Sequence, residues 1–441
     1  MPLDASSSES LSRSDLRTCD VLIIGGGPAG STAAAILASK GRRVVLLEKD
    51  RHPRFHIGES LLPQNLRVFD TLGIRERVAE IGVYKPGARF VSDEHGKHVT
   101  FNFAQGLNQD YTYSYQVKRA DLDTLLFARA RELGAETREG IRVTDVTLDS
   151  AKGHRIVATD ADGEQHAWQA RFVIDASGRD TFLAAHMQVK QRNPHNNTAA
   201  MFAHFRNVAP FAETEDGNIT IHLFEHGWFW MIPLPGDVAS VGCVSNQAFF
   251  KRRTGDIDDF FAATIASTPS MARRMAQAER VTPTTMTGNY SYASKTMAGD
   301  GWLMAGDAFA FVDPVFSSGV LLAMASAEMG AEAVDTWLDD RAAAAPQMRA
   351  FEHKVRRAIG SLSWLIYKIN DPTLRDMFME PRNRFRMREG LVSLLAGDVH
   401  SNTNLQLPVI AFKACYYALR VARWFGYRPG TKGMERVTRA A

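Results

Sequence analysis

The chain has few cysteines, no long apolar run and almost no net charge. Its three cysteines, Cys19, Cys243 and Cys415, are far apart and form no C-x-x-C pair, so neither a disulfide framework nor a cysteine zinc site is expected. The longest uncharged stretch, residues 21–39, is rich in glycine, alanine and serine, which predicts a strand, a turn and a helix instead of a membrane span. We therefore expect a cytoplasmic protein with no transmembrane helix and no bound metal.

The composition that remains is that of an ordinary folded protein, with 45% apolar and 23% charged residues in 441 positions. Charge is unevenly distributed along the chain. Residues 341–441 carry 18 Lys and Arg against 7 Asp and Glu, a net charge of +11, whereas the first 340 residues sum to −8. The overall charge of +3 indicates no nucleic-acid partner. Residues 1–18 are rich in serine and are predicted to be a disordered leader.

A glycine-rich turn between a predicted strand and a predicted helix is the first feature that carries chemistry. Gly25, Gly27 and Gly30 form G-x-G-x-x-G after an apolar strand, and a second strand at residues 42–49 carries Glu48 near its end. This βαβ context indicates a dinucleotide site, where the glycines let the backbone approach a pyrophosphate at the helix N-terminus. Glu48 accepts hydrogen bonds from ribose hydroxyls and repels the extra phosphate of NADP, which leaves FAD or NAD.

Two later segments favour FAD. Residues 301–308 predict a strand that ends in Gly-Asp, where Asp307 can bind the ribityl hydroxyls of a flavin, and residues 172–178 predict a further buried strand running into a glycine turn. No second G-x-G-x-x-G follows a strand, so one dinucleotide must carry the chemistry. The predicted cofactor contacts in the first turn also include Pro28, Ala29 and Ser31.

These patterns predict an α/β fold in three parts. A Rossmann-like FAD-binding domain of the glutathione-reductase type spans residues 19–195 and 285–340, with residues 85–115 contributing to the substrate region. Strand-like segments separated by glycine, proline and acidic turns predict an antiparallel β-sheet substrate domain at residues 196–284. Residues 341–441 are predicted to form a basic helical C-terminal region.

Four segments carry a more specific signal. Residues 228–233 read W-x-W-x-I-P, residues 311–319 read F-x-x-P-x-x-S-x-G, residues 56–63 read HIGESLLP, and Lys85 precedes a Pro-Gly pair. With these motifs, roughly the first three quarters of the chain resembles the flavin-dependent halogenases, and most closely their phenol and pyrrole branch. That family lies within the superfamily of FAD-dependent hydroxylases and geranylgeranyl reductases.

The resemblance implies a role for each motif. Lys85 corresponds to the lysine that receives hypohalous acid, by a hydrogen bond or as a haloamine, and directs it at the aromatic carbon. Trp228 and Trp230, two apart on a strand and so on one face, correspond to residues that separate the flavin from the substrate. Without the resemblance, Lys85 is equally a surface lysine and the tryptophans an aromatic core pair.

The serine-rich turn before an apolar helix corresponds to the family's halide site. Ser317, Ser318 and Gly319 offer backbone N–H groups to an anion beside the flavin, although the same sequence is also an ordinary helix N-cap. The implied cofactors are reduced FAD, supplied by a separate flavin reductase, and chloride or bromide. Arg119 joins the cofactor-binding residues on the same grounds.

Phe316 departs from the pattern of the tryptophan halogenases, which have a glutamate just before the serine of the halide site. A phenol or pyrrole activates its own ring, so we expect a small aromatic substrate of that kind, free or tethered to an acyl carrier protein. Two alternatives stay open: a hydroxylase or geranylgeranyl-reductase-like enzyme on the same fold, and a catalytically inactive flavoprotein scaffold. The basic tail is expected to bind an acidic partner such as a carrier protein, or to touch a membrane peripherally.

Overall fold

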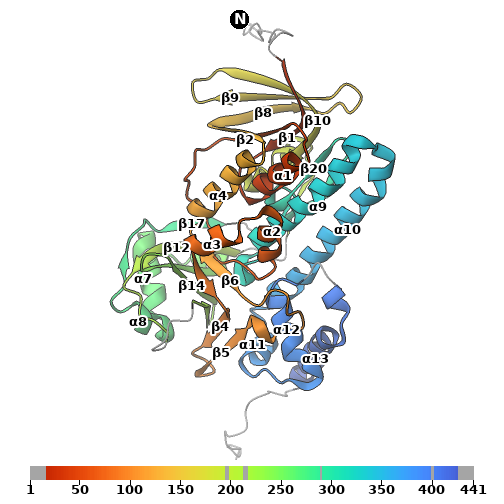
Figure 1. Cartoon of the computed structure of the whole chain (residues 1–441). Coiled ribbons are helices and arrows are strands. Elements are labelled where there is room, and N and C mark those ends of the chain that lie inside the picture. The colour runs from red at the N-terminus through yellow and green to blue at the C-terminus, as the bar shows by residue number, and fades with distance from the viewer. Residues whose placement is uncertain (1–15, 194–197, 212–216, 289–290, 399–401, 426–441) are drawn as a thin grey trace, which may run out of the picture.

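The computed structural model describes residues 16–193, 198–211, 217–288, 291–398 and 402–425. Three parts follow one another along the long axis in Figure 1: a sheet of mainly parallel strands at one end, a second and mainly antiparallel sheet in the middle, and a group of helices at the other end. This is the α/β architecture with a helical C-terminal region that the sequence predicts.

The first sheet contains the βαβ unit predicted from the glycine motif. β1 (Leu16–Ile24) leads through α1 (Pro28–Ser39) to the parallel strand β2 (Val44–Glu48). On the other side of β1, the parallel strands β10 (Gln165–Asp175) and β20 (Trp302–Met304) continue the sheet. Their apolar runs are continuous because both faces of these strands are covered. The sheet is completed by β7 (Glu136–Glu139), β8 (Ile141–Thr147), β9 (His154–Asp160) and β19 (Ala298–Gly299).

Helices pack closely on this sheet. α1 lies against α4 (Arg119–Glu132) and α9 (Gly319–Asp339). Almost every residue of α1 is buried, and most of them are small, which lets the neighbouring helices and the sheet approach its backbone. This packing fixes the glycine turn at the start of α1 relative to the start of α9.

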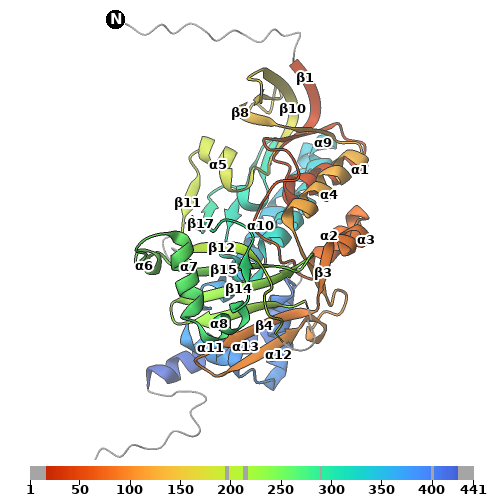
Figure 2. The same cartoon turned by 90° about the vertical axis from the view of Figure 1, so that its left-hand side faces the viewer.

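The second sheet forms as the strand pattern predicts. Its strands run in the order β16-β12-β15-β14-β13-β4-β5, and β17 pairs with β12. All neighbouring pairs are antiparallel except β13 with β4. The bounds are β4 (Gly87–Ser92), β5 (Lys97–Asn102), β12 (Thr198–Arg206), β13 (Ile219–Phe224), β14 (Gly227–Leu234), β15 (Val238–Asn246), β16 (Glu279–Arg280) and β17 (Thr285–Gly288). Figure 2 shows these strands crossing the middle of the molecule.

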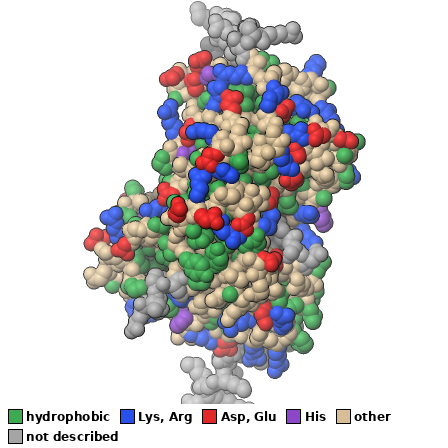
Figure 3. Space-filling model, viewed as in Figure 1, with side chains coloured by type: hydrophobic (Ala, Val, Ile, Leu, Met, Phe, Trp, Pro, Cys, Tyr) green, Lys and Arg blue, Asp and Glu red, His purple; other side chains and the backbone are tan. Residues whose placement is uncertain are grey.

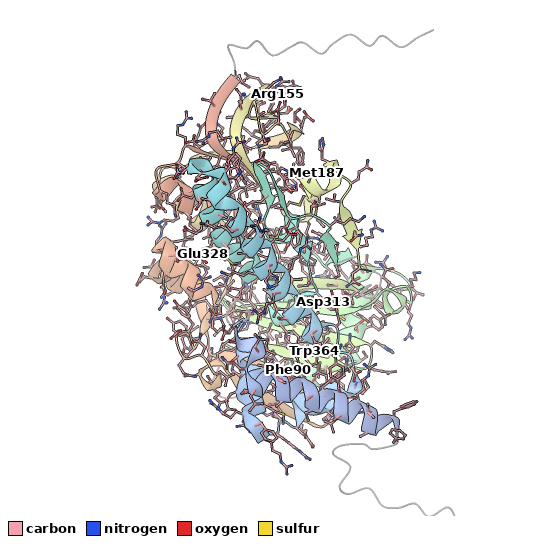
Figure 4. All side chains as sticks on the ribbon, turned by 90° about the vertical axis from the view of Figure 1, so that its right-hand side faces the viewer. Phe90, Arg155, Met187, Asp313, Glu328 and Trp364 are labelled. Atoms are coloured by element: carbon pink, nitrogen blue, oxygen red, sulfur yellow. The ribbon has the colours of Figure 1, made fainter. Side chains whose placement is uncertain are left out.

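The C-terminal helices cover the end of the second sheet. They are α10 (Arg341–Ile366), α11 (Pro372–Met379), α12 (Met387–Leu395) and α13 (Leu407–Trp424). Phe378 of α11 meets Phe90 of β4 edge-on, with ring centroids 4.8 Å apart, so the tail shares a core with the sheet. Figure 4 labels Phe90 of β4 and Trp364 of α10, which both contribute to this core.

Smaller elements complete the described fold. Two short sheets pair β3 (Gly82–Lys85) with β6 (Ser114–Val117), and β18 (Tyr292–Ser294) with β11 (Lys190–Arg192) and β21 (Ala310–Phe311). The remaining α-helices are α2 (Asn65–Leu72), α3 (Arg75–Ile81), α5 (Phe182–His186), α6 (Gln247–Phe250), α7 (Ile257–Ala266) and α8 (Pro269–Met275). Of the predicted leader, residues 1–15 lie outside the described residues, and residues 16–18 are the first residues of β1. In the described part of the chain, no helix is long and apolar enough to cross a membrane.

Candidate active site

A cavity of about 720 Å³ lies at the carboxyl ends of β1, β2 and β10. Gly25 and Glu48 line it from the first sheet, and Phe202, Trp228 and Trp230 line it from the second. The cavity therefore joins the predicted cofactor site to the predicted substrate domain.

The glycine turn has the geometry that a dinucleotide needs. Gly25 has a φ of +101°, and a Cβ there would lie 2.4 Å from the carbonyl oxygen of Ala176. A Cβ on Gly30 would lie 1.8 Å from the carbonyl oxygen of Gly25, so only glycine lets α1 pack this closely on the turn. A Cβ on Gly27 would meet only Arg54 Nη2, at 3.6 Å. The backbone at Gly27 is thus open to a ligand at the N-terminus of α1.

The other predicted contacts of this turn divide into two groups. Pro28 and Ala29 line the cavity. Ser31 instead donates its hydroxyl to the carbonyl oxygen of Gly26, at 3.0 Å, and so holds the turn. Glu48 is buried at the end of β2, where Oε2 accepts a hydrogen bond of 2.7 Å from the Gly26 N–H. The carboxylate therefore stands beside the turn, as a ribose-binding acid requires.

Arg119 and Asp307 form the polar side of the cavity. Arg119 opens α4 and is held by a bidentate pair with Asp123, at 2.8 and 2.9 Å, while Nη1 donates to the carbonyl oxygen of Ile57 at 2.8 Å. Asp307 is half-buried and lines the cavity. Burial raises the pKa of its carboxyl to about 6, against the charges of Arg119 and Arg179. These groups can bind a polyhydroxylated chain.

The predicted halide turn also reaches the cavity. Ser317 and Gly319 line it, and Ser317 has a left-handed backbone with a φ of +59°. Ser318 is fully buried at the N-terminus of the 21-residue helix α9, and its Oγ has no hydrogen-bond partner among the described residues. Asp313, labelled in Figure 4, anchors the loop by accepting a hydrogen bond of 2.9 Å from the Thr198 hydroxyl. The turn thus brings Ser317 and Gly319, at the N-terminus of a long helix, to the cavity, whereas the Ser318 side chain lies behind its wall.

Trp228 and Trp230 are a wall of the cavity as well as part of the core. They lie on one face of β14 with ring centroids 6.0 Å apart. Trp230 Nε1 donates to Ser240 Oγ at 3.1 Å, and a Cβ on Gly242 would lie 2.1 Å from its ring. Because Gly242 leaves this room and Ser240 satisfies the indole N–H, the ring is fixed in place.

Lys85 is not a surface lysine. Its side chain is 1% exposed, and Nζ donates to Ser60 Oγ at 2.8 Å and to the carbonyl oxygen of Leu61 at 2.7 Å. Burial lowers the pKa of the ammonium to about 7. Ser60 lines the cavity, so Lys85 lies directly behind the wall that Ser60 forms. The side chain is therefore shielded from solvent, and its amine loses its proton more readily than that of an ordinary lysine.

Glu59 is a site residue to which the sequence analysis gave no role. It is buried and lines the cavity beside Ser60. Oε1 lies 2.9 Å from His204 Nε2 of β12, and the buried Oε2 has no partner among the described residues. The motif at residues 56–63 contains Glu59, but its partner His204 is 145 positions away along the chain. No local pattern marks this pair.

Phe316 places an apolar ring, and no carboxylate, just before the predicted halide turn. Its ring lies among Phe90 and Phe378, with centroids 6.5 and 6.3 Å away, and packs into the apolar core. The position next to the predicted halide turn therefore carries no carboxylate, whereas the buried Glu59 lines the cavity from a different loop.

Comparison with known proteins agrees with this geometry. The family described as an FAD binding domain matches residues 18–343. A 1H-pyrrole-2-carbonyl-(peptidyl-carrier protein) brominase from Pseudoalteromonas luteoviolacea is 32% identical over 331 residues, which cover 74% of this chain and 79% of the relative. The chain belongs to the flavin-dependent halogenases. Membership favours halogenation over the hydroxylase, reductase and scaffold alternatives that the sequence left open.

Two further similarities extend the comparison of this halogenase. A tryptophan 2-halogenase from Chondromyces crocatus is 36% identical over 324 residues, 71% of this chain and 60% of that protein. The structure of the myxobacterial chondrochloren halogenase CndH, a variant of the FAD-dependent halogenases, matches with a TM-score of 0.76 and 29% identity, covering 94% of this chain and 98% of that one.

The halogenase uses FAD, and its own residues fit that cofactor. The open backbone at Gly27 and the N-terminus of α1 suit the pyrophosphate, and Glu48 suits the ribose. Asp307 and Arg119 suit the ribityl chain, and the cavity extends from there to the halide turn.

Proposed function

We propose that this halogenase places chlorine or bromine on a phenol or a pyrrole that is delivered on an acyl carrier protein. The observation that carries the proposal is Lys85, fully buried with a pKa of about 7 and hydrogen-bonded to the cavity wall. The relative named as a pyrrolyl-carrier-protein brominase supports the substrate class. The apolar surroundings of Phe316 support a ring that activates itself.

The protein's part in the reaction begins with the halide and the substrate. When bound, reduced FAD supplied by a separate flavin reductase would, with O2, provide the oxidation that turns a halide into hypohalous acid. Ser317, Ser318 and Gly319 hold the halide with N–H groups at the start of α9. Trp228 and Trp230 keep the organic substrate away from the flavin and so suppress hydroxylation.

Lys85 then holds the oxidant by one of two routes. In the first, neutral Nζ attacks the halogen, the N–halogen bond forms as the O–halogen bond breaks, and the hydroxide takes a proton from Nζ and leaves as water. The ring carbon next takes the halogen, and the electron pair of the N–halogen bond returns to Nζ. In the second, the ring takes the halogen directly while the ammonium gives a proton to the departing hydroxide, which leaves as water. In both routes the ring loses a proton, which Glu59 Oε2 accepts and returns to Nζ, so that the amine or ammonium is restored.

Product mass tests the proposal. The purified, FAD-loaded enzyme is supplied with a separate reductase, NADPH, O2 and bromide, and is given candidate phenols and pyrroles both free and bound to a carrier protein. We expect the near-equal isotope doublet of bromine in the carrier-bound product, with little NADPH oxidation when the reductase is left out. A hydroxylated product independent of halide would contradict halogenation, and equal rates on free substrate would contradict the carrier.

A further inference from the structure

The last helix of the described chain has an unusual outer surface. Six large apolar side chains point to solvent along its length and at its end, and we call them the apolar face of α13: Leu407, Ile410, Tyr417, Val421, Trp424 and Phe425. Trp424 is 85% and Phe425 81% exposed. From Leu407 to Trp424 the successive spacings are three, seven, four and three residues, so these side chains share one side of the helix. An exposed apolar stripe of this size marks a binding surface.

The inner side of α13 shows that the helix is fixed to the body. Val409, Phe412 and Tyr416 are buried, and the Tyr416 hydroxyl donates to Asp371 Oδ2 at 3.0 Å. At the edge of the apolar face, Trp364 of α10, labelled in Figure 4, donates through Nε1 to the hydroxyl of Tyr417 at 2.9 Å and ties the helix to α10. Because the inner side of α13 is already packed against the body, the helix cannot turn its apolar face inward without exposing the residues that are now buried.

The surroundings of the apolar face are basic. Residues 381–425 carry seven Lys and Arg and two Asp and Glu, a net charge of +5. Arg382 and Arg384 are exposed on the loop beside α13, and Figure 3 shows basic side chains at this lower end of the molecule. The sixteen residues that follow, 426–441, add four Lys and Arg and one Glu.

We propose that α13 docks this halogenase on an anionic membrane surface, lying in the plane of the headgroups. Eighteen helical residues span about 27 Å, and with a fixed inner side the helix can lie on a bilayer but not cross it. The acyl region receives the apolar face, and tyrosine and tryptophan suit the headgroup level. The basic segments meet the negative surface.

The charge around the apolar face argues against a second copy of the chain or an acidic protein as its binding partner. A second copy would bring two basic regions together, each with a net charge of +5 over residues 381–425. An acidic protein would need cations within the contact, whereas the apolar face itself contains no charged residue. A membrane can bind the apolar face and the basic residues together, because its acyl chains and its charged headgroups lie at different depths.

Docking in this way sets the orientation of the enzyme. α13 packs on α11 and α12, which cover the end of the second sheet, whereas β8 and β9 lie at the opposite end in Figure 1. The substrate side would face the membrane and the FAD-binding sheet the solution. This inference does not rest on the proposed substrate.

Vesicle binding tests the docking surface. Full-length, FAD-loaded protein is mixed with phosphatidylcholine vesicles that contain about one quarter phosphatidylglycerol, or none, and bound protein is separated by flotation. We expect binding to the anionic vesicles to be at least about tenfold tighter and to weaken with added salt. A Trp424→Phe variant should lose most of the vesicle-dependent blue shift of tryptophan fluorescence.

A triple variant, Ile410→Ser, Val421→Ser and Trp424→Ser, removes half of the apolar face without touching the core. We expect it to bind anionic vesicles at least about tenfold more weakly. The control, Val281→Ser with Met286→Ser, changes exposed apolar residues elsewhere and should bind as wild type does. Wild type that stays in solution, or a triple variant that still binds, would overturn the proposal. So would a dimer or a carrier-protein complex that the triple variant breaks when no vesicle binding is seen.

Discussion

Replacing Lys85 should change the rate of halogenation strongly and the stability of the fold only slightly. We consider Lys85→Met, which keeps the length of the side chain, and Lys85→Arg, which keeps the charge. The wild-type Nζ donates to Ser60 Oγ and to the carbonyl oxygen of Leu61 inside the protein. Methionine removes the buried amine but leaves both oxygens without this donor.

The magnitudes come from the burial of the amine. The pKa of Lys85 falls from an ordinary 10.5 to about 7, which corresponds to about 5 kcal/mol. Because the folded-state pKa is the lower one, this cost is fully present below pH 7 and disappears as the pH rises through 10.5. Methionine relieves the cost but loses two hydrogen bonds worth about 1–3 kcal/mol each. The free energy of unfolding at pH 7 should therefore change by no more than about 3 kcal/mol.

The effect on activity should be far larger. At pH 7 about half of the Lys85 amine is neutral, against roughly one in three thousand for an ordinary lysine. Halogenation by wild type should rise with pH through about 7 if the haloamine route operates. Both variants should lose at least about a hundredfold in halogenation while they retain FAD binding and O2 consumption. Lys85→Arg should not restore halogenation, because the guanidinium group stays protonated and offers no neutral amine to the halogen.

The assay follows brominated product by mass beside a small-molecule trap for free hypohalous acid. We expect the trap to capture oxidant that Lys85 no longer holds, or peroxide to accumulate in its place. Lys85→Met that halogenates at the wild-type rate would refute the assigned role. A variant that loses FAD binding as well would show that Lys85 acts on the cofactor site.

Four further variants test the rest of the site. Gly25→Ala should abolish FAD binding, measured by flavin absorbance after gel filtration, because its φ of +101° and the carbonyl group facing it exclude a Cβ; normal flavin content would show that the turn can adjust. Trp228→Ala with Trp230→Ala should lower the product formed per O2 consumed, whereas unchanged coupling would assign the pair to packing alone. Glu59→Gln should slow halogenation about tenfold or more and leave the flavin spectrum unchanged, and an unaltered rate would remove Glu59 from the reaction. Asp307→Asn should raise the Tm of the FAD-free protein at pH 8, because a pKa raised to about 6 makes the charged carboxylate costly there; the gain should fade as the pH falls below about 6 and vanish near 3.8.

Local patterns were sufficient for much of the fold. The glycine turn at Gly25 follows from backbone sterics, and the strands of the second sheet follow from apolar runs between turn residues. The pair Trp228 and Trp230 faces the cavity together because side chains alternate along a strand. Each of these features can be predicted from residues that are neighbours in the sequence, and the fold class follows from the same local patterns.

Several contacts of the site cannot be predicted from the local sequence. Ser31 sits in the glycine motif, yet its hydroxyl turns back to the carbonyl oxygen of Gly26. Glu59 becomes a buried acid of the site only through His204, which comes from a distant strand. Whether a polar group meets solvent, a ligand or another part of the chain depends on elements far away in sequence.

The sequence by itself determined the βαβ unit, the cofactor class and the order of the motifs, because these depend on spacing and on backbone conformation. Only the tertiary structure decided that Lys85 is buried. The β3–β6 pair and the loop of Ser60 surround its amine and remove water, and desolvation is a property of everything packed around a group. The same holds for α13: its apolar residues are visible in the sequence, but only the packing of its inner side shows which of them remain exposed.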